Sequence, residues 1–177
     1  DANHALRPDS DAGNSHTDGR KNGIWGTLLA GGWGNEWYFG YQHAQSDMTC
    51  EDFRSRDAWW DYCRHALEFF EDNDIPFWQM TCDDNMTDAD YCFYKDGECY
   101  VVYDKAGGRA NLNLGANASM FSVRWYDPRN GGGLQEGSVT TVSGPGTVDL
   151  GIAPSSASQD WVILIEQVPE PTDRKSV

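Results

Sequence analysis

The C-terminal half of the chain is a series of short apolar runs separated by turn signals, and this pattern constrains the fold more than any other feature. Pairs such as Asp96-Gly97, Gly107-Gly108 and Asp127-Pro128 mark the turns. Seven short runs at near-regular spacing, with no helical period between them, predict an antiparallel seven-stranded β-sandwich over residues 91–168. The expected strands are 91–95, 98–104, 109–114, 120–127, 138–143, 147–152 and 160–168.

The apolar positions of these runs supply the expected sandwich core, in which Trp125 is the largest side chain. We expect its ring to be buried, whereas a ring at the surface would make Trp125 a candidate for ligand binding. The other core candidates are Val101, Val102, Leu112, Leu114, Phe121, Val123, Val162, Leu164 and Ile165.

The N-terminal part of the chain alternates helical and extended patterns. Apolar residues spaced three and four apart predict a short helix at 20–30 and a stronger one at 58–72. The aromatic run 36–41 predicts a buried strand, and the proline in the apolar stretch 75–80 predicts an extended segment. This order of elements is typical of an α/β layer.

Three polar stretches complete the organisation of the chain. Residues 1–19 predict a long surface loop, residues 81–90 a linker and residues 169–177 a polar tail. The apolar stretch that precedes the linker can pack on both parts of the chain. We therefore expect Trp78 to be largely buried at the junction and the two parts to unfold together.

Charge and aromatic content narrow the range of partners. Thirteen Lys and Arg against 28 Asp and Glu give a net charge of −15, which disfavours nucleic acid and anionic membrane surfaces. No apolar run is long enough to span a membrane, so we expect a soluble protein. Eight Trp and eight Tyr are more than one small core requires, and such rings stack on the apolar faces of sugars.

The cysteines leave two interpretations open. None of the five has the CxxC spacing of a zinc or thioredoxin site, and an odd count leaves at least one free thiol. A two-residue turn at Asp96-Gly97 would place Cys92 and Cys99 on one face of a hairpin, diagonal to each other. Buried free thiols and a single disulfide are both compatible with the sequence, which contains Cys50, Cys63, Cys82, Cys92 and Cys99.

The sequence contains no motif that is typical of a metal-binding or cofactor-binding site. The run from Asp83 to Asp90 is rich in carboxylates but lacks the glycine and the distal glutamate of an EF-hand loop, so a solvated hinge is the preferred interpretation. The four histidines lack zinc-site spacing, and no GxSxG or phosphate-loop motif occurs. We therefore expect no metal and no cofactor.

Four stretches together resemble a known type of protein. IWGTLLAGGWGNEWYFGY (24–41) and SDMTCEDFRSRDAWWDYCRHALEFF (46–70) resemble the last helices and last strand of secreted glycoside-hydrolase-like (β/α) barrels. YCFYKDGECYVVYDKAGGRANLNL (91–114) and FSVRWYDPRNGG (121–132) resemble the sandwich that follows such barrels, a family named "Putative collagen-binding domain of a collagenase". The resemblance implies an α+β composite in which residues 1–80 are the terminal fragment of a (β/α)8 barrel.

The resemblance also bears on activity. In barrel glycosidases the acid/base carboxylate follows the fourth strand and the nucleophile follows the seventh. Residues 1–80 resemble what comes after the seventh strand, so the catalytic pair is expected upstream of Asp1, and whether this chain is itself an enzyme stays open. The resemblance implies a secreted or extracellular location.

Candidate sugar-binding residues lie on the aromatic strand and on the loop after it. Glu36, Trp37, Tyr38 and Tyr41 combine one carboxylate with stacking rings, although some of these rings must be core and a lone carboxylate often has a structural role. The charged loop adds a further set, Asp47 and Arg54. Ion pairing within that loop is the competing interpretation of its alternating charges.

Two functions follow from these features. The leading one is the C-terminal portion of a secreted glycoside-hydrolase-like protein that contributes sugar-contacting aromatics and an accessory sandwich, with carbohydrate as the partner. The alternative is a structural or adhesive protein that self-assembles or binds a matrix, because an incomplete barrel leaves an open edge to be covered by an upstream segment or by self-association.

Overall fold

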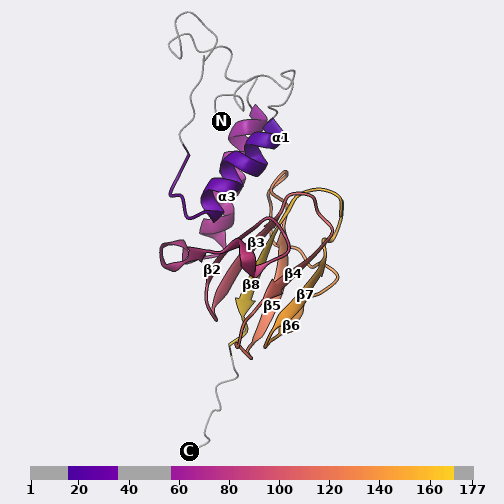
Figure 1. Cartoon of the computed structure of the whole chain (residues 1–177). Coiled ribbons are helices and arrows are strands. Elements are labelled where there is room, and N and C mark those ends of the chain that lie inside the picture. The colour runs from indigo at the N-terminus through magenta and orange to yellow at the C-terminus, as the bar shows by residue number, and fades with distance from the viewer. Residues whose placement is uncertain (1–15, 36–56, 170–177) are drawn as a thin grey trace, which may run out of the picture.

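The computed structural model describes residues 16–35 and 57–169, and everything below refers to those residues. Within them eight strands form two sheets. The larger sheet has the order β1-β2-β3-β8-β5-β6, and the smaller one pairs β4 with β7. All the pairings are antiparallel (Figure 1). The strands are β1 (Thr81–Cys82), β2 (Tyr91–Lys95), β3 (Cys99–Asp104), β4 (Arg109–Asn113), β5 (Met120–Tyr126), β6 (Thr141–Ser143), β7 (Thr147–Ile152) and β8 (Trp161–Gln167).

The seven strands predicted from the sequence all occur close to their expected bounds, which confirms the sandwich. Its core lies between the two sheets and contains the predicted Trp125, which is fully buried. Side chains from both sheets fill this core, for example Val123 from β5 and Leu112 from β4.

The central strands β3 and β8 are apolar on both faces, because the larger sheet is covered twice. Tyr100, Val102 and Ile163 face the sandwich core. Val101 and Leu164 face the opposite way, into a second core beneath the helices. A strand buried on both faces is a continuous apolar run, as β8 shows.

The helices form a third layer on the outer face of the larger sheet (Figure 1). The first helical stretch comprises α1 (His16–Asp18), the π-helical η2 (Gly19–Trp25) and α2 (Gly26–Leu29). It packs with α3 (Asp57–Asp72) against the sheet, and both predicted helices are therefore confirmed. Trp25 lies at the centre of this layer, with its ring stacked 5.6 Å from that of Tyr103 and edge-on to that of Phe69 at 5.5 Å.

Residues 75–90 differ from their prediction. The expected extended segment contains a 3-10 turn, η5 (Phe77–Gln79), because Pro76 permits a tight turn where it forbids an α-helix. The expected linker contains β1, which pairs with β2, and a second 3-10 turn, η6 (Asp84–Met86). Residues 81–86 therefore pack at the edge of the larger sheet.

The expectation that Trp78 is largely buried is wrong, because its side chain is 59% exposed. Ile75, which precedes the 3-10 turn, is buried instead, and Trp78 within the turn lies on the surface. The barrel fragment expected for residues 1–80 stays a prediction, since the strand expected at 36–41 lies outside the described residues.

Cys92 and Cys99 lie on opposite faces of the larger sheet, which corrects the predicted hairpin register. Lys95 pairs with Cys99, so the turn between β2 and β3 has three residues where two were expected. A shift of one residue reverses the face on which a side chain lies. Cys92 faces the sandwich core and Cys99 the helical layer, and both are free thiols, as is Cys82.

These buried thiols predict a contrast in reactivity. Burial, supported by nearby carboxylates, raises the pKa of Cys92 and that of Cys99 to about 12, whereas Cys82 is exposed. At pH 8 an alkylating reagent should modify Cys82 in the folded chain and reach the two buried thiols only after unfolding, as peptide mapping by mass spectrometry will show. Fast modification of Cys92 or Cys99 in the folded chain would contradict this.

The same shifts have a consequence for stability. Burial favours the neutral form of both thiols. The stabilisation that neutral Cys92 and Cys99 give the folded chain is therefore complete below the unfolded-state pKa of about 8.5, and it declines as the pH rises toward 12. The free energy of unfolding should therefore fall between about pH 9 and 12, and replacing both cysteines with alanine should make that fall shallower.

Candidate functional site

The six sugar-binding residues predicted from the sequence lie outside the described residues. They are Glu36, Trp37, Tyr38, Tyr41, Asp47 and Arg54. Their roles stay predictions. Both described segments that flank them contribute to a pocket on the helical side of the molecule.

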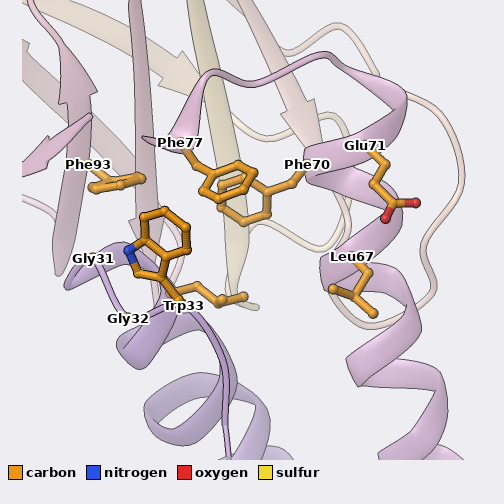
Figure 2. Close-up of a pocket in the computed structure, with 9 residues that line it drawn as sticks. Gly31, Gly32, Trp33, Leu67, Phe70, Glu71, Phe77 and Phe93 are labelled. Atoms are coloured by element: carbon orange, nitrogen blue, oxygen red, sulfur yellow. The ribbon is translucent and has the colours of Figure 1, made fainter. Parts of the chain in front are cut away.

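An aromatic pocket opens where α2, α3, η5 and β2 meet, and its volume is about 170 Å³. In Figure 2 the indole of Trp33 lies between Phe93 of β2 on one side and Phe77 and Phe70 on the other, and the more exposed Trp33 and Phe77 form the rim of the pocket. The pocket is lined by Leu28, Gly31, Gly32, Trp33, Leu67, Phe70, Glu71, Phe77 and Phe93.

Two aromatic rings of this pocket are far more exposed to solvent than the rings of a hydrophobic core. Trp33 is 81% exposed and Phe77 40% exposed, and their rings meet edge-on at 5.7 Å. The ring of Phe77 also lies edge-on to those of Phe70 and Trp78, with centroids 6.2 Å and 5.3 Å apart. The result is a contiguous aromatic surface with the indole of Trp33 at its outer edge.

Local backbone chemistry explains why Trp33 projects into solvent. The N–H groups of Gly31 and Gly32 donate to the carbonyls of Leu28 and Thr27, and they end α2. Gly31 has a φ of +83°, a left-handed conformation that glycine adopts without strain. A Cβ at Gly32 would lie 2.6 Å from the Thr27 side chain, so the close turn requires glycine there as well. The chain therefore leaves the helix abruptly and carries Trp33 away from it.

On the other rim, the turn after α3 positions Phe77. The N–H of Ile75 donates to the carbonyl of Phe70 at 3.1 Å, and Asp74 adopts a φ of +50°. Ile75 is buried, and Pro76 leads into the 3-10 turn that presents Phe77 to the pocket. The rim of the pocket thus consists of two helix ends.

Among the described residues that line the pocket, Glu71 is the one charged side chain. Flat apolar rings, an indole N–H donor and a carboxylate acceptor form the combination that binds a polar ligand with apolar faces, as a sugar has. Phosphate or sulfate would find no cation among the lining residues that the structure describes.

A buried ion pair joins the first helical stretch to the sandwich. Arg20 donates through Nε and Nη2 to the two carboxylate oxygens of Asp160, both at 2.8 Å. The hydroxyl of Tyr103 donates to the same carboxylate at 2.7 Å, and the guanidinium lies over the ring of Tyr62. Asp160 immediately precedes β8, so this pair holds the helix that leads to Trp33 against the central strand.

The sequence contained a signal for this site that its periodicity did not show. Trp33 sits between glycines in Gly-Gly-Trp-Gly, and Phe77 and Trp78 directly follow Pro76. Large aromatic side chains beside residues that end helices are poorly placed for burial, and are therefore candidates for a surface site.

Within the described residues no group of three His, Cys, Asp or Glu side chains is arranged to hold a metal ion. Across residues 16–35 and 57–169, no helix has the length and apolarity needed to cross a membrane.

Comparison with known families decides the classification of the sandwich. The family model described as "Putative collagen-binding domain of a collagenase" matches residues 75–166, which is more than half of the chain. The chain belongs to this family. The match begins at the end of the helical layer and continues to β8, so it includes β1 and η6.

Solved structures support the same fold. The chain is similar to a protein named "Glycoside hydrolase", with a TM-score of 0.63, 13% identity and 89% of this chain covered. It is also similar to a glycoside hydrolase family 5 protein from Bacteroides vulgatus, with a TM-score of 0.64, 12% identity and 89% coverage. The match spans 38% of each of those longer proteins. No curated protein sequence matches the chain.

Proposed function

We propose that the chain acts as the C-terminal accessory portion of a secreted glycoside-hydrolase-like protein and that its aromatic pocket contacts carbohydrate. The observation that carries this proposal is the exposed, edge-on contact between Trp33 and Phe77 above a pocket with one carboxylate. Exposed rings that pack on each other offer rigid faces for the C–H groups of a sugar, at little cost in conformational entropy.

Family membership and structural similarity support the accessory role. The sandwich belongs to a family whose name refers to matrix binding, and the longer proteins of similar fold are named as glycoside hydrolases. We infer that residues 1–80 are the end of a (β/α) barrel, that the catalytic carboxylates lie upstream, and that Glu36, Trp37, Tyr38, Tyr41, Asp47 and Arg54 extend the sugar-binding surface.

Replacing Trp33 with alanine tests the pocket. Neutral oligosaccharides such as xylo-, manno- and cellohexaose, titrated calorimetrically, should bind the native chain and bind Trp33→Ala about tenfold more weakly, since loss of a stacking ring costs roughly 1.4 kcal/mol. Trp33→Phe should retain part of the affinity. Met120→Ala, which removes an exposed apolar side chain outside the pocket, is the matched control.

Unchanged affinity in Trp33→Ala would contradict a sugar-contacting pocket. The second candidate function, self-assembly, is favoured by the exposed apolar side chains of the pocket, Trp33 and Leu67, and by the exposed Trp78 beside Phe77. Sedimentation of the chain distinguishes the two. Stable oligomers that dissociate in Trp33→Ala, without any response to oligosaccharide, would favour assembly over carbohydrate binding.

A further inference from the structure

A second hollowed surface lies on the sandwich itself, on the side of the larger sheet away from the helices. The smaller sheet has two strands and covers only part of the six-stranded sheet, so the β1–β2 edge extends beyond it. There Thr87, the residue after η6, forms a bridge with Leu112 of β4. Two adjoining hollows that share Met86 form a groove at this edge, with volumes of about 470 and 300 Å³.

The groove has an aromatic wall held in place by stacking. The ring of Tyr94 lies parallel to that of Tyr100, with centroids 5.7 Å apart. Tyr100 is fixed in turn, because its hydroxyl donates to Asp96 and accepts from the N–H of Gly97, both at 2.9 Å. Tyr94 is partly exposed and therefore offers one edge of a rigid ring to the groove.

Amide side chains form the polar wall, and hydrogen bonds fix their orientation. Asp88 accepts from both the main-chain N–H and the side-chain amide of Asn111, each at 2.6 Å. The side-chain oxygen of Asn113 accepts from the N–H of Gly115, and that of Asn117 from the N–H of Ser119, both at 2.9 Å. Within the described residues the amide nitrogens of Asn113 and Asn117 donate no hydrogen bond, so both are available to a ligand.

The charges of the groove select the class of ligand. Its lining, as far as the structure describes the chain, contains the carboxylates of Asp88 and Asp96 and no lysine, arginine or histidine. An anionic ligand would be repelled, and no group of three metal ligands exists in the described part of the chain. Oriented amide donors, carboxylate acceptors and an aromatic wall suit a neutral ligand that carries many hydroxyl groups.

We propose that this groove binds a neutral oligosaccharide, with Asn113 and Asn117 donating to its hydroxyls and Tyr94 contacting a sugar ring. The two adjoining hollows suit an extended ligand of more than one sugar unit. This inference shares its ligand class with the proposed function, but it uses different residues on a different layer of the fold and can be tested separately.

Nuclear magnetic resonance of the full chain reports on the two sites at once. Addition of a neutral hexasaccharide should shift the side-chain amide signals of Asn113 and Asn117, in the native chain and in Trp33→Ala alike. The double variant Asn113→Asp and Asn117→Asp keeps both acceptor bonds and removes both donors. It should weaken binding at the groove at least tenfold and leave the shifts around Trp33 intact.

Controls make each outcome decisive. Gln159→Glu makes the same amide-to-carboxylate change on an exposed loop that lines neither hollow, and should bind like the native chain. A sulfated hexasaccharide should not shift the groove amides. Three outcomes would overturn the groove proposal. The shifts could be confined to the surroundings of Trp33, the groove amides could respond to no neutral oligosaccharide tested, or the double variant could bind as well as the native chain. If Trp33→Ala abolished all binding and the double variant bound normally, the groove proposal would fail and the proposed function of the aromatic pocket would still hold.

Discussion

Replacing Asp160 with asparagine is expected to destabilise the chain by about 3–5 kcal/mol, because the buried guanidinium of Arg20 would lose its counter-charge. Both side chains are inaccessible, with Arg20 2% and Asp160 0% exposed. Burial alone lowers the pKa of Arg20, but the hydrogen bonds and charge of Asp160 raise it overall. Burial and the Asp160 charge likewise raise the pKa of Tyr103, so its hydroxyl stays a donor to the carboxylate.

Urea unfolding, followed by circular dichroism and tryptophan fluorescence, measures this loss. Asp149→Asn is the control, because it breaks an exposed pair with Arg109 and should cost under about 1 kcal/mol. A loss below about 1 kcal/mol in Asp160→Asn would show that the buried pair contributes little.

The same pair predicts that helices and sandwich unfold together. Arg20 belongs to the first helical stretch and Asp160 precedes β8, so separating the two layers exposes both charges and the shared core around Trp25. The native chain should therefore give one transition with both probes. Limited proteolysis that cuts rapidly within residues 81–90 and releases a folded sandwich would contradict this coupling.

Replacing Trp125 with alanine should cost about 3–5 kcal/mol, the range for truncating a large buried aromatic side chain. Trp125 is 0% exposed and meets Trp161 edge-on at 6.2 Å in the sandwich core. A Cβ added at Gly137 would lie 2.4 Å from its indole nitrogen, so the chain packs tightly around the ring. Truncation therefore leaves a cavity with little scope for collapse.

Thermal and urea unfolding of Trp125→Ala test this expectation. Trp125→Phe should lose less stability, since a smaller ring retains most of the contacts. Trp78→Ala is the matched control at an exposed position and should change stability by less than about 1 kcal/mol. A loss under about 1 kcal/mol in Trp125→Ala would mean that the core tolerates the cavity.

The strands of the sandwich were predictable because alternation and turn residues act over a few neighbouring residues. The run from Trp161 to Gln167 is apolar enough to indicate a strand from its composition alone. Strand β1 was not predictable, since two residues carry no period and their pairing with β2 defines them. The faces of Cys92 and Cys99 depended on one residue of turn length, which the Asp-Gly pair did not specify.

The candidate sites were harder to predict from the sequence, because they bring together residues that are distant in the chain. An aromatic excess indicated carbohydrate, but the exposure of Trp33 and Trp78 depends on how two helix ends dock on the sheet. The groove arises because the chain just after η6 pairs with β4 through Thr87 and Leu112, which no local pattern encodes. Arg20 and Asp160 are 140 positions apart, and each alone resembles an ordinary surface charge. Local periodicity therefore specifies the strands and helices, whereas burial, ion pairing and pocket shape follow from long-range packing that only the folded chain brings about.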